Sequence, residues 1–366
     1  MQRSGTADLP LHAGAAPPWL YRRMVALSEG IVAALVDEYG RTGFLRRVAD
    51  PFWFQSLACV LGYDWHSSGT TTVTTAALRD ALDRTDVGVR IAGGKGRTSR
   101  RTPAEVAEKG TALGLTTRRI QEMQRASRLA AKVDTAAVQD GYALYHHAFL
   151  FSEDGGWAVV QQGMCDASGY ARRYHWLGDD LRSFVQEPHA AILGRREPAV
   201  LDLTAAASRG ARDVSLDLAR DQPNHLRSLF VSAAKEGQST LDRWSGEEGR
   251  HFRLPAEVDW ETLRAAYEVQ PVGYEDLLLV RGMGPATVRA LALIADLIFG
   301  AASSWQDPVK YSFAVGGKDG VPFPVDRASM DACIEVLRQG LDASPAEAAE
   351  KRAALRRLAV LAPPAR

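Results

Sequence analysis

The chain has 366 residues, of which 46% are hydrophobic and 24% charged, as in globular proteins. Its 44 basic and 44 acidic residues cancel. This balance excludes a protein whose whole surface binds nucleic acid, so any nucleic-acid site must be local. No apolar run approaches the roughly 18 residues of a membrane span, and the N-terminus carries no recognisable secretory signal. We therefore expect no membrane partner.

Cysteine usage indicates a reducing compartment. Cys59, Cys165 and Cys333 are odd in number and widely spaced, which fits neither a disulfide framework, nor a zinc site, nor an iron–sulfur cluster. We therefore expect a cytoplasmic protein, and at this length we expect two domains.

The first part of the chain predicts mainly helices. Apolar residues at helical spacing predict a helix over 20–35 that Gly40 ends, and two further helices over 50–61 and 70–82. Alternating apolar residues over 87–91 predict a short strand. After it, Thr-Pro-Ala-Glu at 102–105 resembles a capping box that begins a helix, and another helix is expected over 117–138.

The chain then becomes rich in strand-forming residues. Four strands are expected, over 145–151, 157–162, 170–177 and 199–203, the first two forming a hairpin. From about residue 205 the pattern is helical, and a second capping box at 344–347 predicts a final helix. We therefore predict an α+β fold. A mixed α/β domain with an antiparallel hairpin spans 1–208, and a helical domain spans 209–366.

The segment 280–287, Val-Arg-Gly-Met-Gly-Pro-Ala-Thr, predicts a helix, a tight turn and a second helix beginning at Pro285. Glycines at the turn leave N–H groups uncovered, and these can bind a DNA phosphate beside the helix N-terminus. The pattern resembles the helix-hairpin-helix motif of DNA repair proteins. The resemblance implies sequence-independent contact with the DNA backbone at Gly282, Met283, Gly284 and Thr287. The alternative is an ordinary αα-hairpin with a glycine turn.

The segment 90–132 is locally basic. It holds eleven Lys and Arg against three Glu, a difference of +8. Such clusters supply the salt-dependent part of nucleic-acid affinity. Within it, the loop 93–100 interleaves glycines, cations and hydroxyls without the spacing of a Walker loop. We expect DNA contacts here and at the pair 172–173, unless the loop is only solvated. The expected contacts are Lys95, Arg97, Arg100, Arg101, Arg172 and Arg173.

A set of polar residues lies in or beside the expected strands, where polar groups are costly unless partnered. The set comprises Asp134, Asp140, His146, His147, Gln161 and His175. Carboxylates with a neighbouring amide can hold Mg²⁺ or Mn²⁺, and such a metal polarises a phosphate and activates water. We expect Asp134 and Asp140 to be metal ligands and a histidine to act as base. The alternative is a structural polar network.

A second kind of site is conceivable at Asp326. In helix-hairpin-helix glycosylases a catalytic aspartate follows the hairpin in a Val-Asp context, and Val325-Asp326 is similar. However, Ala286 stands where the bifunctional enzymes carry a lysine, which argues against a Schiff base. Asp326 is equally suited to capping a helix.

Several segments together resemble the family labelled domain of unknown function 763. They are 3–12, 93–96, 140–147, 161–164, 172–176 and 316–320. The resemblance spans most of the chain and implies no particular activity. The combined patterns predict a DNA-binding protein of repair or recombination, foremost a metal-dependent DNA nuclease. A non-enzymatic scaffold that recruits a repair enzyme and a monofunctional DNA glycosylase are the alternatives. A repair-protein partner and self-association both stay open.

Overall fold

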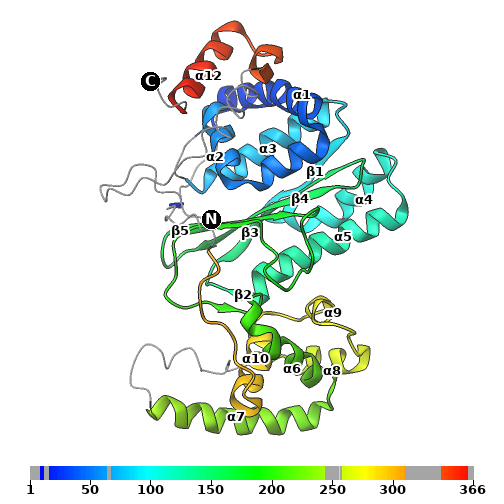
Figure 1. Ribbon diagram of the computed structural model, residues 1–366, viewed down its shortest axis with the longest axis vertical. Helices are drawn as coiled ribbons and strands as arrows, with labels where there is room; N and C mark the ends of the chain where they lie inside the picture. The colour runs from blue at the N-terminus through cyan, green and yellow to red at the C-terminus, as the bar shows by residue number, and fades with distance from the viewer. Residues whose placement is uncertain are drawn as a thin grey trace.

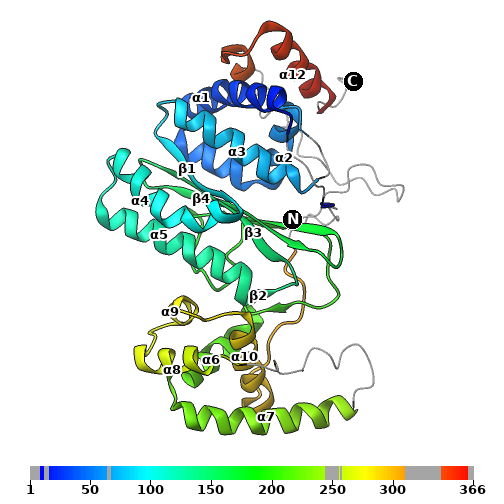
Figure 2. The same ribbon diagram turned by 180° about the vertical axis from the view of Figure 1, so that it is seen from behind.

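A computed structural model describes residues 9–11, 16–63, 67–243, 255, 258–309 and 339–361 of the chain. The described elements are stacked along the long axis of the molecule, with one β-sheet between two groups of helices and a further helical group beyond (Figure 1). The view from behind shows the same succession of layers (Figure 2). Among these residues, no helix has the length and apolar character needed to cross a membrane.

Three helices come first: α1 (Pro18–Ala49), α2 (Pro51–Val60) and α3 (Gly69–Arg84). All three were predicted, but α1 continues beyond Gly40. That glycine has φ 68° and ψ 174°, so it kinks the helix instead of ending it. Asp50 caps α2, because its side chain accepts from the N–H of Phe52 at 2.8 Å and of Trp53 at 3.0 Å.

The sheet is antiparallel and five-stranded, in the order β1-β3-β4-β5-β6. Its strands are β1 (Val89–Lys95), β3 (Ala143–Ser152), β4 (Trp157–Cys165), β5 (Tyr170–Leu177) and β6 (Ala191–Leu193). The expected hairpin is β3 and β4, and the antiparallel α+β fold is confirmed. The strand expected over 199–203 is only β7 (Leu201–Asp202), which pairs with β2 (Val138–Gln139) outside the main sheet.

A 3-10 turn, η1 (Gly96–Arg101), leads from β1 to α4 (Thr102–Ala112), which is followed by α5 (Thr117–Lys132). The helix predicted over 117–138 ends earlier, in a π-helical turn η2 (Val133–Ala137). The capping box at 102–105 was wrong although the helix begins there. Glu105 accepts instead from the N–H of Gly93 at 2.9 Å and pairs with Arg79 at 3.3 Å.

Side-chain alternation buries both faces of the sheet. Ala148, Leu150 and Val160 pack against α1–α3, whereas Phe149 and Val159 face α4 and α5. A fully covered antiparallel sheet therefore has no solvated face, and polar strand residues lie in the interior on either side.

The helical group consists of α6 (Arg209–Arg220), α7 (Pro223–Arg243), α8 (Trp260–Val269), α9 (Tyr274–Leu279) and α10 (Pro285–Phe299). Its core is continuous with the core between the sheet and α5, so burial does not divide the chain at 208–209.

The last described helix, α12 (Ala348–Leu361), does not join this helical group. It packs against α2, and Glu350 pairs with Arg23 of α1. The second capping box was also wrong: α12 begins three residues later than predicted, and Ser344 donates to Leu341 O at 2.9 Å instead of capping it.

Candidate nucleic-acid interface

The segment 280–287 forms a turn between α9 and α10. Gly282 has φ 89°, a left-handed conformation that favours glycine, and it is exposed. Met283 is completely buried, and its N–H donates to Val280 O at 3.0 Å. The buried Met283 side chain holds the turn on the core, so that the glycines on either side of it are presented at the surface.

The turn offers backbone donors. Among the described residues, no hydrogen bond uses the N–H of Gly282 or Gly284, and Gly284 is the N-cap of α10. The predicted contacts at Met283 and Thr287 need correction. The N–H of Met283 is already bonded, and the Thr287 side chain is only 2% exposed. The N–H groups of Gly282 and Gly284 are therefore available at the start of α10.

The turn is fixed to the first part of the chain. Lys132, at the end of α5, donates to Met283 O, and Gln139 Nε2 donates to Pro285 O at 2.8 Å. Arg125 of α5 also pairs with Asp276 of α9 at 2.8 Å. Burial lowers the pKa of Lys132. These contacts place the α9–α10 turn at the C-terminal end of α5.

Six of the eleven cations of the basic segment are engaged within the protein. Arg90 donates to three backbone carbonyls, and Lys109 pairs with Asp83 at 2.7 Å. Glu122 pairs with Arg118 and Arg119 of α5. Arg125 pairs with Asp276 of α9, and Lys132 donates to Met283 O in the α9–α10 turn. The engaged cations are Arg90, Lys109, Arg118, Arg119, Arg125 and Lys132.

The other five cations are exposed and, in the described part of the chain, have no carboxylate partner. They are Lys95, Arg97, Arg100, Arg101 and Arg128. The Nζ atom of Lys95 lies 5.9 Å from the ring centre of Tyr145. Four of the five belong to β1 and η1, and the fifth projects from the middle of α5, so the free charge is concentrated in one region.

Helix α5 connects this region to the α9–α10 turn. Gln124 Nε2 donates to Pro103 O, just after η1, at 2.7 Å. Arg128 follows one helical turn later, and Lys132 follows Arg128 by another turn, about 12 Å from Gln124. η1, which carries three of the free cations, therefore lies beside Gln124 of α5, and the two glycines lie at the Lys132 end of the helix, with Arg128 between them. Lys95 directly precedes η1 and is the register partner of His146 of β3. These five free cations and two glycine N–H groups form one set. We call this set of seven groups the α5 track.

The expected catalytic residues are not on that surface. Asp134, in η2, has no exposed surface, and all its partners are protein groups. Its Oδ1 lies 2.5 Å from His189 Nε2, and its Oδ2 accepts from Trp176 Nε1 at 2.9 Å and from Gln161 Nε2. Three donors therefore surround this carboxylate.

The same chain of contacts continues to His147. Gln161 Oε1 accepts from His147 Nδ1 at 2.6 Å, which leaves Nε2 to accept from Ser127 Oγ at 2.9 Å. A serine beside an oriented imidazole is the arrangement of an activated nucleophile. Here Ser127 is only 2% exposed between α5 and the sheet, and burial lowers the pKa of His147. We assign the chain a structural role, tying α5 to the strands.

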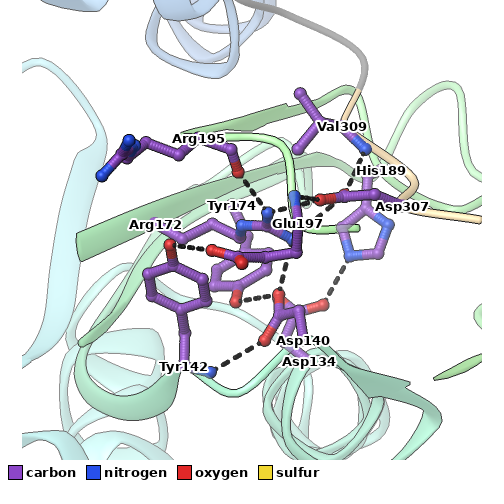
Figure 3. A network of polar contacts seen from close by, with 10 residues as sticks. All are labelled: Asp134, Asp140, Tyr142, Arg172, Tyr174, His189, Arg195, Glu197, Asp307 and Val309. Carbon is purple, nitrogen blue, oxygen red and sulfur yellow. Dashed lines mark hydrogen bonds and ion pairs between the residues drawn. The ribbon is translucent and has the colours of Figure 1, made fainter. Parts of the chain in front are cut away.

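Asp140 belongs to a second network on the same side of the sheet (Figure 3). Its Oδ2 accepts from Arg172 Nη1 at 3.0 Å and from Tyr174 Oη at 2.6 Å. Arg172 also pairs with Asp307, at 2.7 Å. Burial raises the pKa of Asp140, and the charge of Arg172 opposes this shift. Arg172 therefore joins β5 to the segment after α10, and its burial contradicts the expected DNA contact.

The remaining predicted residues lie on the opposite face, against α2 and α3. His146, Arg173 and His175 are 2%, 0% and 0% exposed. Burial lowers the pKa of all three, to about 3 for His146 and about 9 for Arg173. The sheet thus separates His146 and His175 from Asp134 and Asp140, and the burial of Arg173 contradicts its expected DNA contact.

The predicted metal ligands do not fit a hard cation in this arrangement. Within the described ranges, no three His, Cys, Asp or Glu gather in a way that could hold a metal ion. Asp134 and Asp140 each face N–H or O–H donors, whereas a cation needs oxygen atoms with free lone pairs. Asp326, the glycosylase candidate, lies outside the described residues.

Sequence reasoning missed three residues of these networks. His189 and Asp307 lie in irregular segments, and Glu197 accepts from Tyr142 Oη at 2.7 Å. No local pattern marks them, because their partners Tyr142, Asp134 and Arg172 are each more than 50 residues away in the sequence.

The model of the family described as Protein of unknown function (DUF763) matches residues 5–325. The chain belongs to the DUF763 family. The match covers the sheet, the helices on both of its faces and the α5 track of this DUF763 protein. No curated protein and no solved structure matches the chain. The function of this DUF763 protein is therefore argued from its geometry.

Proposed function

We propose that this DUF763 protein binds DNA through the sugar-phosphate backbone, without reading the base sequence. One observation carries the proposal: in the described part of the chain, five exposed cations without a carboxylate partner are gathered in η1, in the adjoining end of β1 and in α5, and α5 is bonded to the turn that holds two free glycine N–H groups. Cations and helix N-termini are the groups that proteins use to contact phosphates. The proposed place of action is the cytoplasm.

The number of unpaired cations predicts how strongly DNA binding should depend on salt. A cation that is already paired with a carboxylate adds little binding free energy when it neutralises a phosphate, because it must first leave its partner. The α5 track offers five cations that lose no such partner. If each neutralises one phosphate of a duplex, the logarithm of the association constant should fall with the logarithm of salt concentration with a slope of about −4.5, from about 0.9 per phosphate.

Two sets of substitutions with equal charge change test the proposal. The first replaces three track cations, Arg97, Arg100 and Arg128, by glutamine. The control replaces three engaged arginines by glutamine, namely Arg118, Arg119 and Arg84, the last of which pairs with Glu29 of α1 at 3.3 Å. Each set lowers the net charge by three. Binding of a labelled duplex of mixed sequence is measured by fluorescence anisotropy at several salt concentrations.

The first set should reduce the slope by about 2.7 and weaken binding at every salt concentration, whereas the control set should change the slope by less than about 1. Equal effects of the two sets would mean that only net charge matters and would refute the α5 track. A flat salt dependence of the native protein would refute phosphate binding altogether. Duplexes of unrelated sequence should bind with similar affinity.

Nuclease activity stays a prediction, because the donors around Asp134 and Asp140 support no metal-dependent step. Of the alternatives drawn from the sequence, a DNA-binding scaffold agrees best with a track that carries cations and no carboxylates. Incubation of labelled DNA with Mg²⁺ or Mn²⁺ tests this choice. Cleavage abolished by Asp134→Asn would contradict the scaffold.

A further inference from the structure

A row of buried polar side chains crosses the sheet on the face covered by α2 and α3. His146 of β3 is paired with Gln162 of β4, which is paired with Arg173 of β5. Thr71, in the first turn of α3, accepts from Arg173 Nε at 2.8 Å and donates to Gln162 Oε1. His175 follows Arg173 by two residues on β5 and therefore faces the same side of the sheet. We call His146, Arg173 and His175 the Arg173 site.

Arg173 is a buried cation without a counter-charge in the described part of the chain. Its polar partners are Thr71 and Gln55 Oε1, at 3.1 Å, and its guanidinium lies 4.9 Å from the ring centre of Phe54. Its sequence neighbour Arg172, on the other face, pairs with two carboxylates. An unpaired buried charge is strongly unfavourable. A bound anion would remove this penalty.

Among the described residues, three nitrogen atoms of the site have no hydrogen-bond partner: Arg173 Nη1, His146 Nδ1 and His175 Nε2. Arg173 and His175 both lie against the ring of Phe54, at 4.9 Å and 5.7 Å from its centre. His146 and Arg173 contact Thr75 and Thr71, one turn apart on α3, so the three side chains face the same part of the interior. Native proteins leave few buried polar atoms unsatisfied, and such atoms often mark a missing ligand.

Tautomers define what the two imidazoles can bind. Thr75 donates its hydroxyl to Thr71 O at 2.8 Å, so it accepts from His146 Nε2 at 3.0 Å. His175 Nδ1 faces Val48 O at 3.2 Å and therefore carries its hydrogen. Both unpartnered imidazole nitrogens are then acceptors. The site thus combines a guanidinium donor with two acceptors.

We propose that the Arg173 site binds a phosphate group, either inorganic phosphate or a phosphate monoester. Its charged oxygen accepts from Arg173 Nη1, and the protonated oxygen of hydrogen phosphate, or of the monoester monoanion, donates to an imidazole nitrogen. Sulfate carries the same tetrahedral oxygens but has no hydroxyl at neutral pH, so it satisfies only the guanidinium. The first turn of α3 adds the positive end of a 16-residue helix. This site lies on the α2–α3 side of the sheet, whereas α5 and the α9–α10 turn lie on the other side; of the α5 track, Lys95 is next to the site, as the register partner of His146.

Thermal unfolding of the dialysed full chain tests the proposal. Sodium phosphate, sulfate and chloride are compared at equal ionic strength. Phosphate should raise the Tm most, in proportion to the logarithm of its concentration once the site is saturated. Calorimetric titration with phosphate then gives the Kd. Dinucleotides with and without a 5′-phosphate distinguish a nucleic-acid end from free phosphate as the source.

Arg173→Met should weaken phosphate binding at least tenfold and abolish the specific Tm shift. Arg212→Met, which removes another buried arginine bonded to Leu203 O, should keep the shift. His146→Leu removes one acceptor and should shrink the advantage of phosphate over sulfate, so it tests the site if Arg173→Met does not fold. A native protein that phosphate stabilises no more than chloride does, or equal shifts in Arg173→Met, would overturn the proposal. Either result leaves DNA binding by α5 untouched.

Discussion

Acidification should unfold this protein in a narrow pH interval, because three of its histidines are buried and uncharged. His146, His147 and His175 are at most 6% exposed. Burial lowers the pKa of each, and neighbouring cations lower it further at His146 and His175. Only Asp134 and the Gln161 amide oppose the shift, at His147, and the Val48 carbonyl does so at His175.

The size of the effect follows from linkage. An unfolded histidine has a pKa near 6.5, so below that pH the unfolded chain binds protons that the folded protein does not. The free energy of unfolding is therefore independent of these histidines above about pH 7. Below that pH it falls by up to about 1.4 kcal/mol per pH unit for each histidine. At about pH 5, His146 and His175, which stay neutral, cost about 4 kcal/mol together, and the lowered pKa of His147 adds to this cost.

Two buried carboxyl groups act in the opposite direction. Burial raises the pKa of Asp140 and of Asp202, so the folded protein takes up protons there before the unfolded chain does. Their protonation offsets part of the histidine effect as the pH falls. The loss of stability between about pH 7.5 and 5 should therefore be smaller than the sum of the histidine contributions.

Urea unfolding at a series of pH values between about 7.5 and 5 measures this loss. His146→Asn should remove about 2 kcal/mol of the difference between the two ends, whatever its effect at neutral pH. His225→Asn is the control, because its side chain is 58% exposed. If the free energy of unfolding of His146→Asn fell with acid as much as that of the native protein, the assignment of a buried neutral imidazole to His146 would be refuted.

The remaining predictions concern the Arg172 network and the α9–α10 turn. Arg172→Met should lower the free energy of unfolding in urea by about 3–5 kcal/mol, because it leaves two buried carboxylates unpaired. Adding Asp140→Asn and Asp307→Asn should restore most of this loss. A loss below about 1 kcal/mol in Arg172→Met would contradict the role of the network. Gly282→Ala should cost about 1–3 kcal/mol, because φ is 89° and the new Cβ would lie 2.1 Å from Thr262 Oγ1. Gly284→Ala, with its nearest atom at 3.6 Å, should be neutral, and equal costs would argue against the strained turn. Gly284→Glu should weaken duplex binding about tenfold whereas Gly284→Gln should not; equal binding by the two variants would remove the turn from the interface.

Local patterns predicted most of the fold. Alternating side chains identified β3, β4 and β5, and periodic apolar residues identified the helices. The capping box at 102–105 was misread because Glu105 bonds Gly93 of β1, a contact between different elements. The return of α12 to α1 and α2 was equally hidden, because an amphipathic helix does not specify its partner.

The site was predictable only where it is local. The turn at Gly282 and Gly284 followed from its glycines and Pro285, and the cation cluster followed from composition. Sequence could not separate free from engaged cations, since Arg125 pairs with Asp276 about 150 residues later. Arg172 and Arg173 were misplaced because strand alternation puts them on opposite faces, and helices cover both.

The most direct test of DNA binding by the α5 track is nuclear magnetic resonance of protein labelled with ¹⁵N-glycine. On addition of a mixed-sequence duplex at about 0.1 M salt, the amide signals of Gly282 and Gly284 should shift. Gly114, at the turn between α4 and α5, serves as the control and should not shift, because its N–H donates to Thr111 O at 3.0 Å and no free cation lies beside it in sequence. A duplex that binds while Gly282 and Gly284 stay unchanged, or that does not bind, would contradict the account.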